Sequence, residues 1–335
     1  MLLRIVKTAV SLALLVLFAI LLFIAVELYR PLTIPDDKAV FVVEKGRGAG
    51  SVSRALKDRG FIRARLPFVA AYRLFFYPAK IKAGEYELVR PLRQKGLLDL
   101  LVKGRVVLHS VTVPEGLTVR EIRPLVSPLL ADGGIGFEAS ARDTRPVAAF
   151  DDRAADLEGY LFPETYLFPK GVTSAEAVGA MVNQFKSVFG ESWRSRAGEL
   201  RMSVRQTVIL ASLIEKETSV PSEKPLVSAV FHNRLKIGMK LDCDPTVIYA
   251  LKLKDAYAGQ LSRKDLALDS PYNTYRYAGL PPGPICNPGR EALEAALYPA
   301  AAPYLYFVAT DDGGHRFSRT FSEHAAAVQL YRNRR

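Results

Sequence analysis

The chain has 335 residues, of which 49% are apolar and 24% are charged. These proportions are those of a globular protein long enough for two domains, not of a disordered chain. The net charge of +12 is compatible with nucleic acid, anionic lipid or an acidic polymer as a partner. The basic residues are scattered and no signature of a nucleic-acid-binding module is present, so we expect no nucleic-acid partner. The two cysteines and four histidines lack the spacing of zinc or haem ligands, which predicts no metal and no cofactor.

The N-terminal segment is apolar enough to cross a membrane. Thr8 to Val26 is an almost unbroken run of Ala, Val, Leu, Ile and Phe, and about 19 helical residues span most of a ~30 Å hydrocarbon core. Arg4 and Lys7 precede the run, which favours a cytoplasmic N-terminus. A cleaved signal peptide is the competing interpretation, but its A-x-A-like site is missing. We predict a single-pass anchor over residues 1–30 and a Pro-containing linker over residues 31–38.

Residues 39–110 are predicted to form a small unit of strand, helix, helix and strand. The strands are expected at Ala39–Val43 and Ala83–Leu88, and the helices at Ser51–Arg59 and Leu66–Phe76. This order, in about 50 residues, is typical of a LysM-type carbohydrate-binding unit. The glycines before the first helix do not match a phosphate-binding loop or a dinucleotide fingerprint.

The stretch Ser203–Thr218 is predicted to be a helix with an unusual acid on its apolar face. Ser203 and Gln206 have the spacing of a capping box. At 100° per residue, one face collects Ile209, Leu210, Leu213 and Ile214. Glu217 falls on this same face, whereas Glu215 points nearly the opposite way. A buried carboxyl without a cation has a raised pKa and suits a general acid. The alternative is a carboxylate paired inside a core, or one that reaches water at a frayed helix end.

Three later regions are also candidates for parts of a functional site. The aromatic run Leu157–Pro169 suits either a sugar-binding cleft or ordinary core packing. In the helix expected at Ser222–Lys236, Arg234 falls on the apolar face and must be paired. We expect it to bind another carboxylate, such as Glu215 or Glu223, because pairing with Glu217 would lower the pKa of that acid. The Pro- and Tyr-rich loops after this helix are typical places for a site.

Near the C-terminus, Tyr304–Ala309 should be a buried strand with Arg316–Ser318 as its hairpin partner.

Six motifs occur in order along the second part of the chain: LEGYLFPETY, LASLIEKET, VFHNRLKIGMKLDCDPTVIY, SPYNTY, GLPPGPICNPG and YLYFVA. Together they resemble the MltG-like (YceG-like) endolytic murein transglycosylases over essentially the whole chain. The resemblance implies an α+β protein with an inner-membrane anchor, a LysM-like unit, and a mixed α+β catalytic domain over residues 111–335 on the periplasmic side. It also implies cleavage of the MurNAc–GlcNAc bond inside nascent peptidoglycan strands, which leaves a 1,6-anhydro end and limits strand elongation. The cytoplasmic membrane and peptidoglycan synthases are the partners that it suggests.

The catalytic residue that the resemblance implies is Glu217, the second Glu of EKET, acting first as acid and then as base. Thr218 fills the position of a hydroxyl residue that follows this Glu in lytic transglycosylases. Other substrate-binding candidates come from the family motifs: Glu164, Asp244, Tyr272, Asn273 and Tyr275. For Glu164, a second, electrostatic carboxylate and a structural hydrogen-bonding role both stay open.

Cys243 and Cys286 depart from the residues expected at these loop positions in the family. If they face an oxidising compartment, they could form a disulfide between the two loops; the alternative is two separate small side chains. Two other functions stay open as well. One is a non-catalytic wall-binding or divisome scaffold protein, and the other is a hydrolase that uses water with Glu164 as the partner of the acid.

Overall fold

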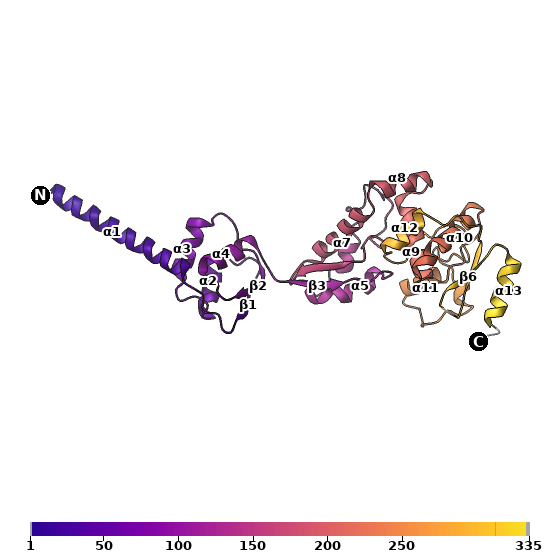
Figure 1. The fold of residues 1–335 in the computed structure, drawn as a ribbon, viewed down its shortest axis with the longest axis horizontal. Coiled ribbons are helices and arrows are strands. Elements are labelled where there is room, and N and C mark those ends of the chain that lie inside the picture. Colours follow the sequence, from indigo (N-terminus) through magenta and orange to yellow (C-terminus); the bar gives the residue numbers. More distant parts are fainter. Residues whose placement is uncertain (1, 312, 333–335) are drawn as a thin grey trace. The chain divides into compact units, whose positions relative to one another are not determined.

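The computed structural model describes residues 2–311 and 313–332. The chain divides into two compact units (Figure 1). The first comprises Met1–His109 with Leu167–Gly171, and the second comprises Ser110–Tyr166 with Val172–Arg335. Both units mix helices with short strands, so the fold is α+β.

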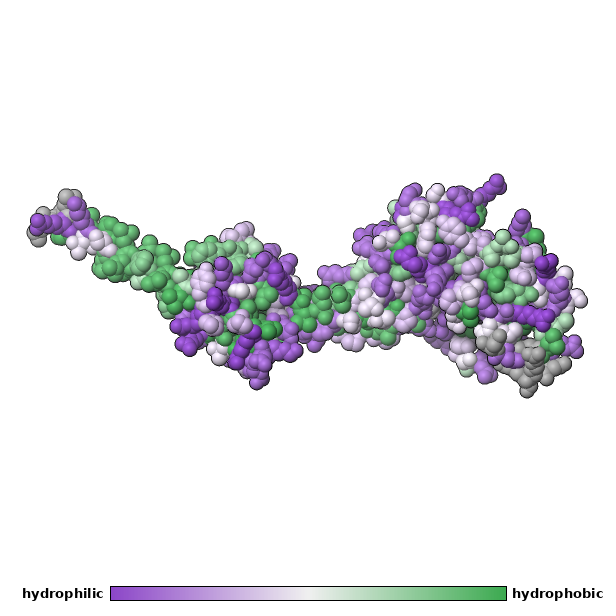
Figure 2. All heavy atoms as spheres, viewed as in Figure 1, coloured by the Kyte–Doolittle hydropathy of each residue, from purple (hydrophilic) through white to green (hydrophobic). Residues whose placement is uncertain are grey.

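The first unit begins with a long apolar helix, α1 (Leu2–Tyr29). From Arg4 to Tyr29 it is long and apolar enough to cross a membrane, and an 18-residue window within it has a mean hydropathy of 3.1. Figure 2 shows the apolar surface that runs along it. Near its end the helix turns from exposed to partly buried, because Ile24 and Leu28 join the core of the unit.

The rest of the first unit consists of three helices and a two-stranded sheet. Its elements are β1 (Lys38–Val43), α2 (Ala49–Asp58), α3 (Arg65–Phe75), β2 (Gly84–Val89) and α4 (Gln94–Lys103). The strands are antiparallel, with Phe41 opposite Tyr86, and both side chains are fully buried. The predicted order of strand, helix, helix and strand is therefore present. A likeness to a LysM-type unit stays a prediction.

Strands β3 (Leu108–Thr112) and β4 (Thr165–Pro169) pair with each other. The boundary between the two units falls within each of these strands. The second unit is mostly helical. Its helices are α5 (Val119–Val126), α6 (Phe137–Ala141), α7 (Ser174–Val188), α8 (Glu191–Glu199), α9 (Val204–Glu217), α10 (Lys224–Lys236), α11 (Asp244–Leu253), α12 (Arg290–Leu297) and α13 (Phe321–Arg332). Short 3₁₀ turns lie at Ser127–Leu129, Pro221–Glu223 and Asp265–Ala267. A hairpin of β5 (Tyr306–Ala309) and β6 (His315–Ser318) lies near the C-terminus.

Helix α9 is the buried centre of the second unit. All residues from Thr207 to Ile214 are buried, and the helix contacts α8, α10, α11 and α12. The predicted capping box is present: the Ser203 hydroxyl accepts from the N–H of Gln206, whose side chain accepts from the N–H of Ser203. The facing side of α12 is rich in alanine, and small side chains let two helices approach closely. Helix α9 ends at Glu217, and the next residue, Thr218, has an extended backbone.

Candidate active site

The last residues of α9 place two acids in opposite environments. Glu215 accepts from the N–H of Gly289 (3.0 Å) and from the ammonium of Lys224 (3.3 Å). Lys224 is itself buried and lies within 3.7 Å of Glu115 and 3.5 Å of Glu291. Glu215 is therefore a neutralised, structural carboxylate. Glu217, half a turn on, forms no salt bridge with any residue that the structure describes, and the residue as a whole is only partly exposed.

The surroundings of Glu217 raise its pKa to about 7. Burial is the largest cause, because it disfavours the charged form, and the nearby charge of Asp244 adds to it. A hydrogen bond from the Cys243 thiol and the charges of His315 and Arg234 act in the opposite direction. The carboxyl group is thus divided between its acid and base forms near neutral pH, as a group that both donates and accepts a proton must be.

Thr218 ends helix α9 and ties it to the C-terminal hairpin. Its backbone is extended, and its hydroxyl donates to Glu223 (3.1 Å) and accepts from the N–H of Val220 (3.1 Å). Glu223 in turn accepts from the backbone and the ring Nδ1 of His315, both at 2.7 Å. Burial raises the pKa of Glu223, but the bonds from His315 and Thr218 outweigh it and hold that pKa below its usual range. Thr218 therefore fixes the backbone beside Glu217.

The start of α11 and the loop that contains Thr274 bring Asp244 and Tyr275 to the site. Cys243 caps α11, and Thr274 holds it: the N–H of Cys243 donates to the Thr274 hydroxyl (3.0 Å). The next residue, Tyr275, then donates its phenol to Asp244 (2.6 Å). Asp244 stands in the first turn of α11, where the helix dipole favours a carboxylate. The structure thus brings Thr218, Asp244 and Tyr275 to the neighbourhood of Glu217.

The remaining three candidates lie in other surroundings. Asn273 is fully buried, and its side chain holds the loop by donating to the carbonyls of Leu266 and Leu268. Tyr272 packs its ring on Tyr249, with 5.0 Å between centroids. The side chain of Glu164 is exposed at the start of β4 and accepts from the N–H of Thr165. No contact of the described residues joins these three side chains to Glu217.

The sequence left open whether the two cysteines form a disulfide. Cys243 and Cys286 are free and buried, and each thiol has its own partner: Glu217 for Cys243, and the carbonyl of Ser212 (3.4 Å) for Cys286. The site loops are therefore not joined by a disulfide. Arg234 pairs with a carboxylate other than Glu217, as expected, but this carboxylate is Asp242. Glu215 and Glu223 bind Lys224 and His315 instead.

Arg234 also clamps the two segments that flank the site. Its guanidinium donates to the carbonyls of Leu305 (2.6 Å), Leu241 (2.8 Å) and Lys240 (3.2 Å). Its closest carboxylate is Asp242, at 3.4 Å. The expectation that Arg234 leaves Glu217 without an ion pair is confirmed, although its charge still lowers the pKa of Glu217.

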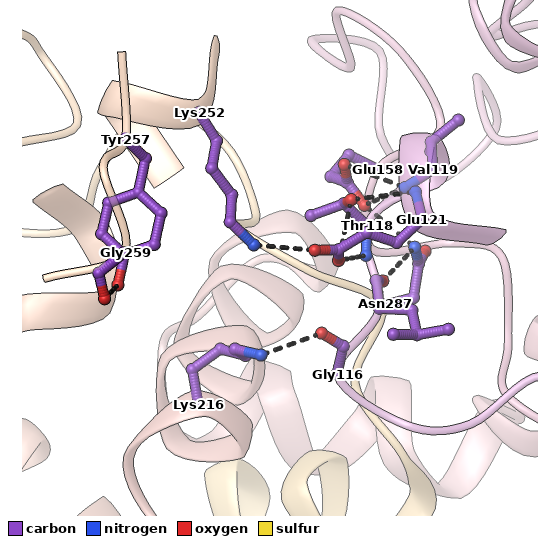
Figure 3. Close-up of polar contacts among 11 residues, drawn as sticks. Gly116, Thr118, Val119, Glu121, Glu158, Lys216, Lys252, Tyr257, Gly259 and Asn287 are labelled. Atoms are coloured by element: carbon purple, nitrogen blue, oxygen red, sulfur yellow. Dashed lines mark hydrogen bonds and ion pairs between the residues drawn. The ribbon is translucent and has the colours of Figure 1, made fainter. Parts of the chain in front are cut away.

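A second buried acid, Glu158, was not among the sequence candidates. It is 6% exposed, and burial raises its pKa to about 8. Its carboxyl group accepts from the N–H of Val119 (3.1 Å) and from the side chain of Asn287 (2.9 Å), as Figure 3 shows. The phenol of Tyr249 lies 3.5 Å away. The available signal was its position after Leu157 in an aromatic run, but the same pattern fits core packing.

Glu158 borders a cavity of about 580 Å³ between α5, α6 and α11. The ion pair of Lys252 with Glu121 (2.7 Å) and that of Arg120 with Asp255 (3.0 Å) lie on its walls. Glu217 does not line this cavity. Because three donors surround Glu158, we interpret it as a clamp that joins the start of α5 to the loop of Asn287.

Known proteins of one family resemble this chain over most of its length. A model of the YceG-like family matches residues 41–330. The chain belongs to the YceG-like family. The resemblance found from the motifs is thereby confirmed.

Two relatives of this YceG-like chain are named endolytic murein transglycosylase. The one from Bacillus subtilis (strain 168) is 32% identical over 315 residues, which cover 86% of this chain and 83% of that protein. The one from Streptococcus pneumoniae (strain ATCC BAA-255 / R6) is 28% identical over 320 residues, which cover 83% of this chain and 56% of that protein. A crystal structure of a YceG-like protein from Listeria monocytogenes matches with a TM-score of 0.55 and 30% identity. That match covers 87% of this chain and 99% of the other. Among the residues described here, no cluster of His, Cys, Asp or Glu could hold a metal ion.

Proposed function

We propose that this protein is an endolytic murein transglycosylase that cuts MurNAc–GlcNAc bonds inside nascent peptidoglycan strands and leaves 1,6-anhydro ends. The observation that carries the proposal is the state of Glu217. It is a carboxyl group at the end of a buried helix that forms no ion pair with the described residues and has a pKa of about 7, in a YceG-like chain. The names of the relatives support the same substrate and reaction.

One carboxyl group suffices for this reaction. Protonated Glu217 donates its proton to the glycosidic oxygen as the bond to C1 breaks. The resulting carboxylate then takes the proton of the muramic C6 hydroxyl, whose oxygen attacks C1 within the same sugar. No water enters, so the second carboxylate of ordinary glycosidases is not needed. We assign Asp244, held by Tyr275, to stabilise the positive charge that develops on the sugar. Substrate contacts of Thr218, Glu164, Tyr272 and Asn273 stay predictions.

We infer that α1 anchors the enzyme in the cytoplasmic membrane. Arg4 and Lys7 precede its apolar run, which favours a cytoplasmic N-terminus and places the rest of the chain on the side of the cell wall. A position at this membrane would bring the enzyme to nascent strands and to the synthases that make them.

The proposal is tested by the ends of the products. The purified protein is incubated with uncrosslinked glycan strands, and the products are identified by mass spectrometry. We expect internal cleavage with 1,6-anhydro ends. New reducing ends would indicate a hydrolase, and uncleaved strands would indicate a wall-binding scaffold; either result would overturn the proposal.

The Cys243 thiol gives a prediction about pH. Its hydrogen bond lowers the pKa of Glu217, so Cys243→Ala should raise that pKa above about 7. Because the acid must be protonated to act, activity falls as the pH rises through this pKa. The variant's falling limb should therefore move to higher pH, by up to about one unit for the loss of one hydrogen bond. The measurement is the pH dependence of kcat/KM.

Cys286→Ala is the matched control. It removes the other buried thiol, which donates to a backbone carbonyl and not to Glu217. Its pH profile should coincide with that of the unmodified enzyme. A falling limb that stays in place or moves to lower pH in Cys243→Ala would contradict the assignment of that limb to Glu217.

A further inference from the structure

The end of helix α3 exposes a short apolar segment, Leu74–Tyr77. Phe75 is 67% exposed and Tyr77 is 72% exposed, and Leu74 is also exposed. Phe76 is partly buried against the core of the unit, so three of these four large residues are exposed. Patches of exposed apolar residues mark interaction sites. All belong to the first unit, which also contains α1.

This segment lies beside the helix that is long enough to cross a membrane. Helix α3 packs on α1, and a cavity of about 470 Å³ lies between them. Its walls include Leu21, Ile24 and Leu28 of α1, together with Phe75 and Phe76. Lys95 and Asp99 of α4 also line it. The apolar surface of α1 therefore continues onto the end of α3.

The polar groups near the end of α1 show where the membrane surface should lie relative to the segment. Glu27 pairs with Arg30 (2.5 Å), and Lys95 lies over the ring of Tyr29 (5.6 Å). These groups form a polar layer at the end of α1. Leu21 precedes Glu27 by six residues, or about 9 Å along the helix axis. The cavity that Leu21 shares with Phe75 thus extends from the polar layer toward the hydrocarbon.

The charges around the segment fit lipid headgroups. Arg73 and Lys80 flank it and are both exposed. Cations at this level attract anionic headgroups, and the ring of Tyr77 suits the boundary between headgroups and acyl chains. A second copy of the chain or a partner protein would not need this match between the depth of the apolar segment and the end of α1.

We propose that Leu74–Tyr77 is immersed in the membrane leaflet next to the first unit, and that a lipid acyl chain fills the cavity between α1 and α3. The proposal rests on the inferred membrane span of α1. It gives the first unit a second, peripheral attachment, so that this unit lies on the bilayer surface and does not swing freely on a single helix.

Tryptophan quenching by brominated lipids tests this directly. The chain has one tryptophan, Trp193, so Trp193→Phe gives a silent background. Phe75→Trp is then compared with Leu22→Trp in α1 and with Leu66→Trp, all in the full chain reconstituted into phosphatidylcholine and phosphatidylglycerol vesicles. Leu66 is 82% exposed on the same helix as Phe75, about 13 Å from it along the axis. The bromine atoms are placed near the carbonyl end or near the middle of the acyl chains.

We expect the tryptophan at position 75 to lose most of its fluorescence, more strongly with bromine near the carbonyl end. The tryptophan at position 22 should also be quenched, and that at position 66 should not. Quenching at 22 without quenching at 75 would overturn the proposal and leave the anchor intact. A blue-shifted but unquenched signal at 75 would mean that protein covers the segment, which also overturns it. No quenching at 22 would overturn the span and this proposal together.

Discussion

Glu217→Gln is expected to lower the rate of glycan-strand cleavage by about 10²–10⁴-fold, the contribution of a positioned acid and base. The amide matches the carboxyl group in shape but can neither donate the proton to the glycosidic oxygen nor remove one from the C6 hydroxyl. Since Glu217 forms no salt bridge within the described residues, the substitution should leave the fold unchanged. The measurement is the initial rate of release of new strand ends, with thermal unfolding as the check on folding.

Two further acids make the result specific. Glu158→Gln removes the other carboxyl group with a strongly raised pKa, and Glu164→Gln removes the exposed candidate for a second carboxylate. We expect Glu164→Gln to keep nearly full activity, because a single acid suffices. Glu158→Gln should act through stability, by weakening the clamp at Val119 and Asn287, with cleavage retained by the folded fraction. Full activity of Glu217→Gln, or equal losses in Glu217→Gln and Glu164→Gln, would contradict the one-carboxyl mechanism.

Arg234→Leu is expected to cost about 3 kcal/mol of stability or more. The substitution leaves the carbonyls of Leu305, Leu241 and Lys240 without their donor, and each buried polar group left unpaired costs about 1–3 kcal/mol. For a unit of this size, a loss of 3 kcal/mol lowers the Tm by about 6–12 °C. Thermal unfolding of the full chain in detergent measures the shift.

Lys236→Leu is the control for this effect. It removes an exposed cation from the same helix, and surface changes of this kind usually alter stability by less than about 0.5 kcal/mol. If Arg234→Leu unfolds at the same temperature as Lys236→Leu, the guanidinium does not hold the segments around the site. Since Arg234 also lowers the pKa of Glu217, the same variant should keep Glu217 protonated to a higher pH.

The sequence was most informative where a local pattern determines the structure. The capping box and the apolar face of Ser203–Thr218 predicted α9, and the same count put Glu217 in surroundings that raise its pKa. The different environments of Glu215 and Glu217 followed from helix geometry alone, because two residues separate them by about 200°. The pairing of β5 with β6 was likewise predicted, from the apolar run Tyr304–Ala309 and the turn that follows it. The expectation that this run is a buried strand is wrong, because β5 is partly exposed in a two-stranded sheet.

The pairing of buried polar groups could not be predicted in the same way. Arg234 was expected to bind a carboxylate, and it does pair with Asp242. Most of its donors are used by backbone carbonyls of irregular segments, whose positions depend on the tertiary fold. The proximity of Cys243 to Cys286 was inferred from loop positions, whereas each thiol packs against a different part of α9. Glu158 was missed because its donors, at Val119 and Asn287, come from distant parts of the sequence.

The directions of the candidate side chains in the loop of Asn273 could not be predicted from the sequence either. The motif placed Tyr272, Asn273 and Tyr275 together along the chain, but successive residues of a turn point in different directions. Tyr275 reaches Asp244 next to Glu217, Asn273 points inward to hold its own loop, and Tyr272 packs on Tyr249.

The most direct test of the central claim is cleavage in water enriched in oxygen-18. If Glu217 transfers the proton of the C6 hydroxyl and that oxygen attacks C1, no oxygen from the solvent enters the product. We predict that mass spectrometry finds every newly formed muramic end as the unlabelled 1,6-anhydro form. New reducing ends that carry oxygen-18 from the first turnover onward would show that water is the nucleophile and would contradict the mechanism.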